Sequence, residues 1–338
     1  MPGHLVAASL IGNLGNQLFQ YAAVKGLQAD PQEPAVLDTR LRVIWGEPLN
    51  GVLQAGSFRE LTSRELLGLR QTPRIHLGQR KVMKLRDCLV RETPRRMGQQ
   101  GFGAPSSALD RIVWSLGAIA PRRWLSHYQF EEADAIGFDP SVRLISPPVL
   151  LRGFFQSEQY FSSRTSIVSD AFSVPGNEVV TNMRSLLAGA RDPDRVVAVS
   201  FRAASDYRDV ALPWGYFSRA AASVVEALGI ADFVIFGDDP SAEHHVRAAL
   251  APYGPVTSLV AEPPLTQLSV MSLLPHVVIS NSTFAWWGAW LGDQNQGMDR
   301  GRVVIAPDPW IGRGDGIVPD RWLRLPRERV ELHDRSRP

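Results

Sequence analysis

The stretch that decides the fold is Leu5-Val-Ala-Ala-Ser-Leu-Ile-Gly-Asn-Leu-Gly-Asn-Gln-Leu-Phe-Gln-Tyr-Ala-Ala-Val-Lys25. It opens with an apolar run of strand length, which ends in a turn that contains Gly12 and Gly15. From Leu18 onward the apolar residues recur at helical spacing, so the stretch predicts a strand, a glycine loop and a helix. A helix that begins at such a turn can bind an anion or a polar ligand, although an ordinary glycine turn is an equal alternative. The third glycine of the dinucleotide pattern G-x-G-x-x-G is missing, which counts against a nicotinamide oxidoreductase.

Strands and helices alternate regularly in the second half of the chain. Predicted helices cover residues 178–190, 214–228, 242–250, 265–274 and 282–291, and predicted strands cover 196–201, 233–236, 256–260, 277–280 and 303–306. Further strands are predicted at 35–38 and 149–155 and a helix at 157–172, whereas residues 41–146 show too little periodicity to assign. This alternation predicts an α/β fold with a parallel sheet and helices on both of its faces.

The chain has 338 residues, which predicts two domains at roughly 100–200 residues each. Pro175-Gly176 and Asp192-Pro193 flank a predicted helix, so we expect an N-terminal domain of residues 1–180 and a C-terminal domain of residues 181–338. Hydrophobic residues make up 44% and charged residues 21%, which is typical of a globular protein. This composition excludes a disordered, collagen-like or coiled-coil chain.

Charge and cysteine content exclude further classes of partner and site. The 36 basic and 34 acidic side chains leave a net charge of +2, so no global field attracts nucleic acid. Cys88 is the only cysteine, which excludes an internal disulfide and a cysteine-based zinc site and favours a reducing compartment. The scattered histidines suggest no metal site. Because no signal-peptide pattern and no membrane-spanning stretch is found, we expect a soluble, cytoplasmic protein.

Candidate binding residues occur just beyond predicted strands, where the loops of a parallel sheet gather around ligands. Arg202 follows the strand at 196–201 and could pair with a phosphate, although a local ion pair with a nearby aspartate is the favoured interpretation. Asp238 and Asp239 follow the strand at 233–236. They could bind a base edge, a ribose or a metal, but capping of the next helix is the favoured interpretation.

A fourth segment opens a helix directly after the strand at 277–280. Its polar start, Asn281-Ser-Thr283, is a candidate anion cradle and also matches a glycosylation sequon. Trp286, Trp287 and Trp290 follow closely. Tryptophans often pack a core, but three beside a polar turn suggest more than packing.

Five groups of segments occur in a fixed order along the chain. They are Gly12-Asn-Leu-Gly-Asn-Gln-Leu-Phe-Gln-Tyr-Ala22, Gly153-Phe-Phe-Gln-Ser-Glu-Gln-Tyr-Phe161, Phe236-Gly-Asp-Asp239, Met271-Ser-Leu-Leu-Pro-His276 with Ser280-Asn-Ser-Thr-Phe-Ala-Trp-Trp-Gly-Ala-Trp290, and Ile305-Ala-Pro-Asp-Pro-Trp310. Together they resemble glycosyltransferase family 11, the bacterial alpha-1,2-fucosyltransferases. The resemblance implies a fold of the glycosyltransferase B type, in which the parallel sheets of two Rossmann-like domains face a cleft. It also implies GDP-fucose as donor, inversion at the anomeric carbon, and neither an essential metal nor another cofactor.

The family's H-x-R-R-x-D segment corresponds to residues 200–206, with differences. Ser200 stands in place of the histidine, Ala203 in place of the second arginine, and one extra residue precedes Asp206. Arg202 keeps the place of the first arginine, which in such enzymes contacts the donor pyrophosphate. These differences leave open a non-catalytic homologue that binds a GDP-sugar without turnover.

The resemblance therefore implies transfer of L-fucose from GDP-fucose to a hydroxyl, galactose O2, of a glycan or glycolipid precursor. The expected donor-binding residues are Gly15, Asn16, Arg202, Asp238, Asp239, Asn281, Ser282 and Thr283. Among them, Ser282 and Thr283 would help Arg202 at the pyrophosphate. Asp206 is the first candidate for the catalytic base and Glu158 the second. A transferase that uses another donor, such as GDP-mannose, is a further alternative.

A basic stretch from Arg70 to Arg96 contains nine arginines or lysines against only Asp87 and Glu92. It could rest on the anionic inner face of a membrane and bring the protein to a lipid-linked acceptor. An ordinary solvated surface is the favoured alternative. The expected partners are thus GDP-fucose as donor and a glycan or lipid-linked oligosaccharide as acceptor. We expect no nucleic-acid partner.

Overall fold

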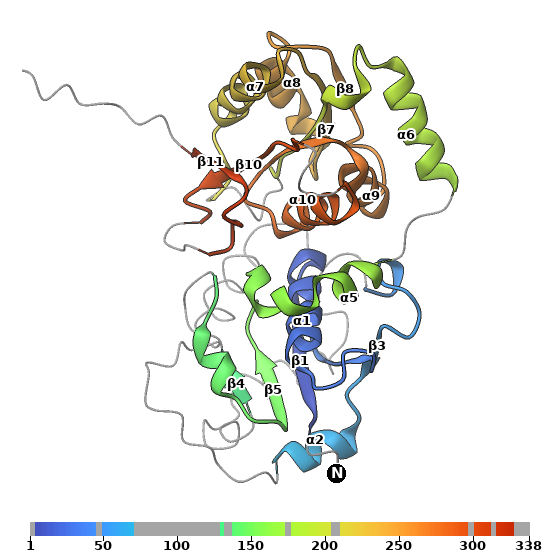
Figure 1. Cartoon of the computed structure of the whole chain (residues 1–338), viewed down its shortest axis with the longest axis vertical. Coiled ribbons are helices and arrows are strands. Elements are labelled where there is room, and N and C mark those ends of the chain that lie inside the picture. The colour runs from blue at the N-terminus through green and yellow to red at the C-terminus, as the bar shows by residue number, and fades with distance from the viewer. Residues whose placement is uncertain are drawn as a thin grey trace, which may run out of the picture.

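The computed structural model describes residues 4–44, 49–70, 129–131, 137–172, 177–203, 210–296, 301–311 and 316–327. Two parallel sheets follow one another along the chain and form two bodies that meet at helices α1 and α10 (Figure 1). The bounds of α1 are Leu14–Leu27, and those of α10 are Thr283–Gln296.

The first sheet has the strand order β3-β2-β1-β5-β4, and its described pairings are all parallel. Its strands are β1 (Val6–Gly12), β2 (Ala35–Ile44), β3 (Phe58–Glu60), β4 (Gln129–Glu131) and β5 (Val149–Arg152), with α2 at Ser63–Arg70. Alternate residues of β1 enter different cores: Val6 and Ala8 pack with α1, whereas Ala7 packs with Leu69 of α2. Both faces of this sheet are therefore covered by helices.

The second sheet has the order β11-β10-β9-β6-β7-β8, again with parallel pairings. Its strands are β6 (Val196–Ser200), β7 (Asp232–Phe236), β8 (Val256–Ser258), β9 (His276–Ile279), β10 (Val304–Asp308) and β11 (Leu323–Pro326). The remaining helices are α6 (Asn177–Gly189), α7 (Trp214–Leu228), α8 (Glu243–Leu250) and α9 (Pro264–Leu273). Val197 of β6 shares a core with α7 and α8, while Ala198 shares one with α9 and α10.

The predicted α/β class is confirmed, and the two helix-covered parallel sheets have the architecture of the glycosyltransferase B type. From Asn177 onward the predicted helices and strands agree with the structure to within a few residues, except that β11 was not predicted. Its sequence Leu-Arg-Leu-Pro is short and mostly exposed, so it lacks the apolar run of a buried strand. The domain boundary at residue 180 stays a prediction.

Two predictions around β5 are wrong. The strand ends at Arg152 rather than continuing to Phe155, because Phe155 has a left-handed φ of 53° and cannot extend a strand. The predicted helix at 157–172 is broken into two short 3-10 turns, at Glu158–Tyr160 and Ser162–Arg164, followed by α5 (Thr165–Asp170).

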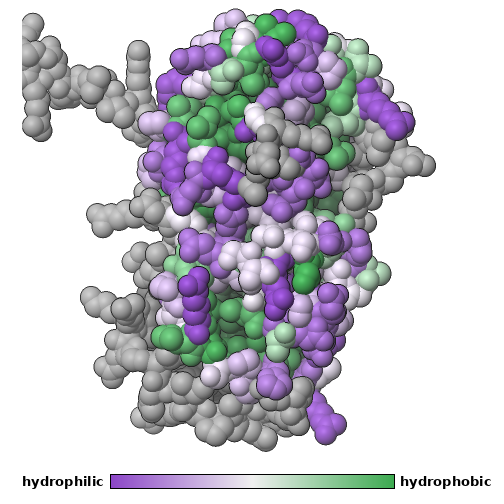
Figure 2. Space-filling model, in the orientation of Figure 1, coloured by the Kyte–Doolittle hydropathy of each residue, from purple (hydrophilic) through white to green (hydrophobic). Residues whose placement is uncertain are grey.

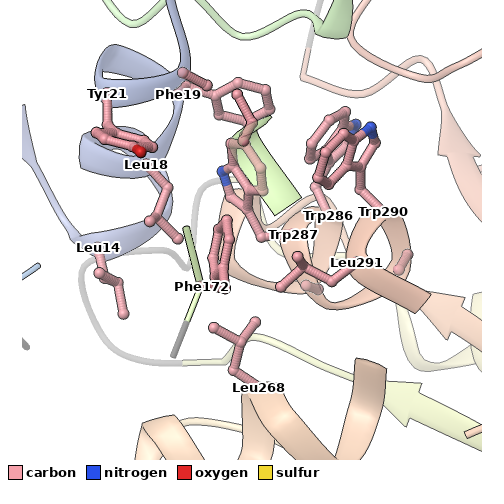
Figure 3. Close-up of a cluster of buried hydrophobic side chains, with 14 of the residues drawn as sticks. Leu14, Leu18, Phe19, Tyr21, Phe172, Leu268, Trp286, Trp287, Trp290 and Leu291 are labelled. Atoms are coloured by element: carbon pink, nitrogen blue, oxygen red, sulfur yellow. The ribbon is translucent and has the colours of Figure 1, made fainter. Parts of the chain in front are cut away.

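One hydrophobic core passes through the junction between the two bodies (Figure 3). Trp286, Trp287 and Trp290 on α10 are fully buried in it. Phe19 of α1 packs against Trp286 and Trp287 with ring centroids 4.5 and 5.0 Å apart. The indole Nε1 of Trp287 donates a hydrogen bond to the carbonyl of Gly15 at 3.0 Å. The tryptophans therefore pack the core, and a role beyond packing stays a prediction.

No helix among the described residues is long and apolar enough to cross a bilayer. Hydrophilic side chains cover much of the face seen in Figure 2, including the level where the two bodies meet.

Gly15 lies at the closest approach of the two bodies. A Cβ atom at this position would lie 2.5 Å from the Thr283 hydroxyl oxygen and 2.5 Å from the backbone nitrogen of Phe284. Because the second of these atoms belongs to the helix backbone, it cannot rotate away. Glycine thus permits the first turn of α1 to touch the first turn of α10.

Gly15→Ala should lower the free energy of unfolding by about 1–3 kcal/mol, because α1 and α10 must move apart. Gly189→Ala is the matched control, since that position at the end of α6 has nothing within 4 Å. The control should be neutral or slightly stabilising. Urea unfolding of both variants measures the difference, and equal stabilities would contradict the close contact at Gly15.

His276, the first residue of β9, forms a neutral bridge in the core. Its Nδ1 accepts a hydrogen bond from the backbone N–H of Val303 at 3.0 Å, and its Nε2 lies 2.9 Å from the carbonyl of Asp194. Since a backbone N–H can only donate, Nδ1 carries no proton and Nε2 is the donor. Burial lowers the pKa of His276 below its usual value.

Stability should therefore fall as the pH drops below about 6.5, because the unfolded chain then binds a proton that folded His276 excludes. His276→Asn should flatten this dependence, whereas His244→Asn, at an exposed position, should leave it unchanged. Urea unfolding between about pH 7.5 and about pH 5.5 measures the slope. A wild-type slope that survives in His276→Asn would assign it to other groups.

Candidate functional site

The starts of two helices adjoin where the two sheets face each other. β1 ends at Gly12 and leads into α1, while β9 ends at Ile279 and leads into α10. The contact of Gly15 with Thr283 brings the first turns of these helices together. Each helix start carries a partial positive charge of about half an elementary charge and unbonded N–H groups. The junction therefore favours an anion.

Arg202 lies at the same edge of the second sheet. It follows β6, whose last residue Ser200 pairs in register with Ile279 of β9. The backbone N–H of Ser280 donates to the Ser200 carbonyl at 2.9 Å, which continues this pairing toward α10. The connections from β6 and β9 run to opposite sides here, which is where ligands bind in open parallel sheets. The structure thus brings Arg202 and the start of α10 to neighbouring strand ends.

Asp238, after β7, holds the loop that carries Arg202. Its Oδ2 lies 3.6 Å from Nη1 of Arg202, and its Oδ1 accepts the backbone N–H of Ala203 at 2.9 Å. Arg202 therefore pairs with an aspartate from the neighbouring strand end, whereas the predicted pairing within its own segment stays a prediction. Arg202 retains a partly exposed guanidinium, with 18% of its side chain accessible. Asp206 lies outside the described residues.

Asp239 caps the helical turn that begins at Pro240. Its Oδ1 accepts hydrogen bonds from the backbone N–H and the hydroxyl of Ser241, at 2.9 and 2.6 Å. The favoured capping interpretation is confirmed for Asp239 but is wrong for Asp238, which contacts Arg202 and Ala203 instead. A contact of either aspartate with guanosine stays a prediction.

Asn281 is buried, and its Nδ2 donates to the carbonyl of Val210 at 2.8 Å. Arg327 donates to the same carbonyl at 2.8 Å. Asn281 thus anchors the chain at Val210, which lies between β6 and α7. The carbonyl of Ser282 accepts the N–H of Trp286, and Thr283 is the first residue of α10. The donor contacts of these three polar residues stay predictions.

Asn16, in the first turn of α1, is half-buried and accepts a hydrogen bond from the side chain of Gln156 at 2.9 Å. Sequence reasoning missed Gln156, although it lies in one of the segments that carry the family resemblance. It also missed Gln20 and Gln267, whose side-chain amides are buried. Each lies among apolar residues of a helix, and a polar residue in such a run could have drawn attention to it.

Gln20 and Gln267 perform the same task in the two bodies. Gln20 exchanges hydrogen bonds with both backbone groups of Ile11 and donates to the Gly153 carbonyl. Gln267 exchanges hydrogen bonds with both backbone groups of Gly237. Each amide supplies the backbone hydrogen bonds that a neighbouring strand would otherwise make at the end of β1 or β7. Both amides therefore fix the loops that follow these strands.

Glu158 pairs with residues of the second body. Its two carboxylate oxygens accept hydrogen bonds from Arg321 at 2.7 and 2.8 Å, and one also accepts the indole N–H of Trp290 at 3.2 Å. Arg321 in turn pairs with buried Asp293, and Asp293 pairs with buried Arg302. This chain of alternating charges joins the segment after β5 to the second body. Glu158 therefore links the two bodies, and its role as the second candidate for the catalytic base stays a prediction.

No group of three or more His, Cys, Asp or Glu residues that could hold a metal occurs within the described ranges. The expectation that no metal is needed stays a prediction. Most of the basic stretch, residues 71–96, lies outside the described ranges, so its contact with a membrane also stays a prediction.

Comparisons with known proteins show partial likeness to glycosyltransferases. No protein-family model matches the chain. Over 116 residues it is 27% identical to the O-antigen biosynthesis glycosyltransferase WbnK of Escherichia coli, covering 34% of this chain and 37% of that protein. Over 60 residues it is 37% identical to an alpha-1,2-colitosyltransferase of Escherichia coli, covering 17% and 19%. The matched stretches thus span well under half of either relative.

Solved glycosyltransferase structures are also similar. A glycosyltransferase of family 9 from Veillonella parvula DSM 2008 matches with a TM-score of 0.44 and 13% identity, covering 96% of this chain and 86% of that chain. POFUT1 in complex with GDP-fucose matches with a TM-score of 0.44 and 12% identity, covering 90% and 98%. The alpha-1,6-fucosyltransferase NodZ co-crystallized with GDP has a TM-score of 0.38 and 11% identity, covering 86% and 92%. These values mark a loose likeness that identifies no shared site.

Glu158→Gln should lower the free energy of unfolding by about 1–3 kcal/mol, because it removes the charge that Arg321 needs at a half-buried position. Glu243→Gln is the matched control: it breaks a more exposed glutamate–arginine pair within α8, which is worth about 0.3–0.5 kcal/mol. Thermal and urea unfolding measure both. Unchanged stability with a loss of turnover of about a hundredfold or more would support Glu158 as a base.

Proposed function

We propose that the chain is a glycosyltransferase that transfers L-fucose from GDP-fucose, with inversion, to a sugar hydroxyl. One observation carries the proposal: the starts of α1 and α10 adjoin at strand ends that also carry Arg202. The junction therefore suits the diphosphate of a nucleotide sugar, which has two adjacent negative groups. The partial sequence likeness to two Escherichia coli glycosyltransferases supports sugar transfer as the reaction.

The reaction would proceed by a single displacement at the anomeric carbon. The acceptor oxygen bonds to that carbon while the bond from the carbon to the β-phosphate oxygen breaks, and the hydroxyl proton passes to a base. Negative charge grows on the departing GDP. Arg202 and the N–H groups of Thr283 and Phe284 would stabilise this charge, which is commonly the largest catalytic contribution. We propose that these groups do this without a metal.

The catalytic base remains Asp206 in this proposal, because Glu158 is held by Arg321 and Trp290. Asp238 would act on the donor through Arg202, whose guanidinium it pairs with. Gly15 would contribute by allowing the two helix starts to adjoin, and Asn16 by offering an amide beside them.

The acceptor in this proposal is a glycan or a lipid-linked oligosaccharide precursor, with galactose O2 as the attacked hydroxyl. The stretch from Arg70 to Arg96 would hold the protein at the membrane surface where a lipid-linked acceptor is found. The name of WbnK, which refers to O-antigen biosynthesis, is compatible with such an acceptor.

Colitose is a second candidate for the transferred sugar, because one of the two matching relatives is named an alpha-1,2-colitosyltransferase. An alternative function is a protein that binds a GDP-sugar without turnover, because Ser200 and Ala203 depart from the family pattern. Calorimetric binding of GDP-fucose, GDP-mannose and a nucleotide-activated colitose separates the donors. GDP release with galactose-terminated acceptors separates an enzyme from a binding protein, and failure to bind any of these donors would contradict the proposal.

Arg202→Ala should weaken GDP binding by about ten- to a hundredfold, because a charge-assisted hydrogen bond contributes roughly 1.5–3 kcal/mol. Arg191→Ala is the matched control: Arg191 pairs with Asp232 at the opposite end of β7. Calorimetry should show GDP affinity unchanged in the control. If the two variants bind GDP equally well, Arg202 does not contact the diphosphate.

A further inference from the structure

The loop after β5 is attached to α1 at two points. Gln20 of α1 donates to the carbonyl of Gly153 at 2.9 Å, and Gln156 donates from its Nε2 to Oδ1 of Asn16 at 2.9 Å. The residues on either side of Gln156 are fixed, since Phe155 and Ser157 are fully buried and a backbone hydrogen bond of 2.8 Å joins them. The loop therefore presents the Gln156 amide to α1 from a rigid base.

The hydrogen bond from Gln156 determines which way the Asn16 amide points. An asparagine side chain has one acceptor oxygen and one donor nitrogen, and here the oxygen is engaged by Gln156. The nitrogen lies over the turn between β1 and α1, since a Cβ added at Gly12 would lie 2.6 Å from Nδ2. Asn16 therefore offers a donor, not an acceptor, next to the adjoining helix starts.

We propose that Gln156 is a positioning residue for sugar transfer, because it fixes Asn16 with its N–H groups toward a diphosphate oxygen of the donor. This inference rests on the proposed function. A freely rotating amide would present its oxygen to the anion part of the time and would lose freedom on binding. The hydrogen bond from Gln156 keeps the oxygen away from the anion and restricts the rotation of the amide before the ligand binds.

The test is a double-mutant cycle of Gln156→Met and Asn16→Ala in the full chain, with calorimetric GDP affinity and turnover of GDP-fucose as readouts. Gln156→Met keeps the length of the side chain and removes its N–H without adding charge. Gln159→Met is the matched control, since Gln159 lies on the exposed side of the same loop.

Gln156→Met should weaken GDP binding by about three- to tenfold and lower kcat, with the acceptor KM unchanged. Gln159→Met should do neither. In the Asn16→Ala background, Gln156→Met should have no further effect, because its target is gone. A merely structural role would instead give effects that add.

Two results would overturn the inference and are distinct from each other. If the wild-type protein binds GDP while Gln156→Met binds it equally well, or if the two changes add, Gln156 does not act through Asn16 and the proposed function stands. If the wild-type protein binds neither GDP nor GDP-fucose, the proposed function fails and the inference fails with it.

Discussion

The packing of α10 against α1 is the interaction on which the rest of the molecule depends. Burial of each tryptophan in this contact removes roughly 150–250 Å² of surface from water, worth at most about 4–6 kcal/mol per residue. The indole N–H groups are also satisfied, by the carbonyls of Gly15 and Ile317 and by the carboxylate of Glu158. Without this core the two sheets would be separate bodies, and the first turns of α1 and α10 would not lie together.

The same contact also brings two like partial charges close together. Two helix starts with partial charges of the same sign lie side by side at Gly15 and Thr283, and this repulsion is present whenever the protein is folded and empty. The hydrophobic core beneath holds them together despite it. A bound anion between them would turn the repulsion into attraction, so ligand binding and the stability of the junction are linked.

The sequence predicted those features that depend on neighbours along the chain. The strand, turn and helix around Gly12 follow from apolar spacing, as do the elements after Asn177. The features it did not predict depend on partners that only the fold brings together. Asp238 meets Arg202 because β6 and β7 are neighbours, and Gln156 meets Asn16 across 140 positions of sequence.

Phe155 illustrates a different limit, because its left-handed backbone is tolerated only where the surrounding core holds it. Local propensity favours an extended phenylalanine there, and the sequence around it reads as a continuing strand. The burial of the tryptophans has a related cause: their spacing on α10 shows the polar turn beside them, but only the fold shows that α1 packs against them.

The shared tryptophan core has a consequence for how such a protein can evolve. In many two-domain proteins the halves recombine freely, so that a new substrate preference can be acquired by exchange of one domain. Here an exchange would separate Gly15 from Trp287 and Glu158 from Arg321, and would pair each half with a surface it does not fit. An exchange of one half would therefore have to preserve the contacts that the other half makes across the junction.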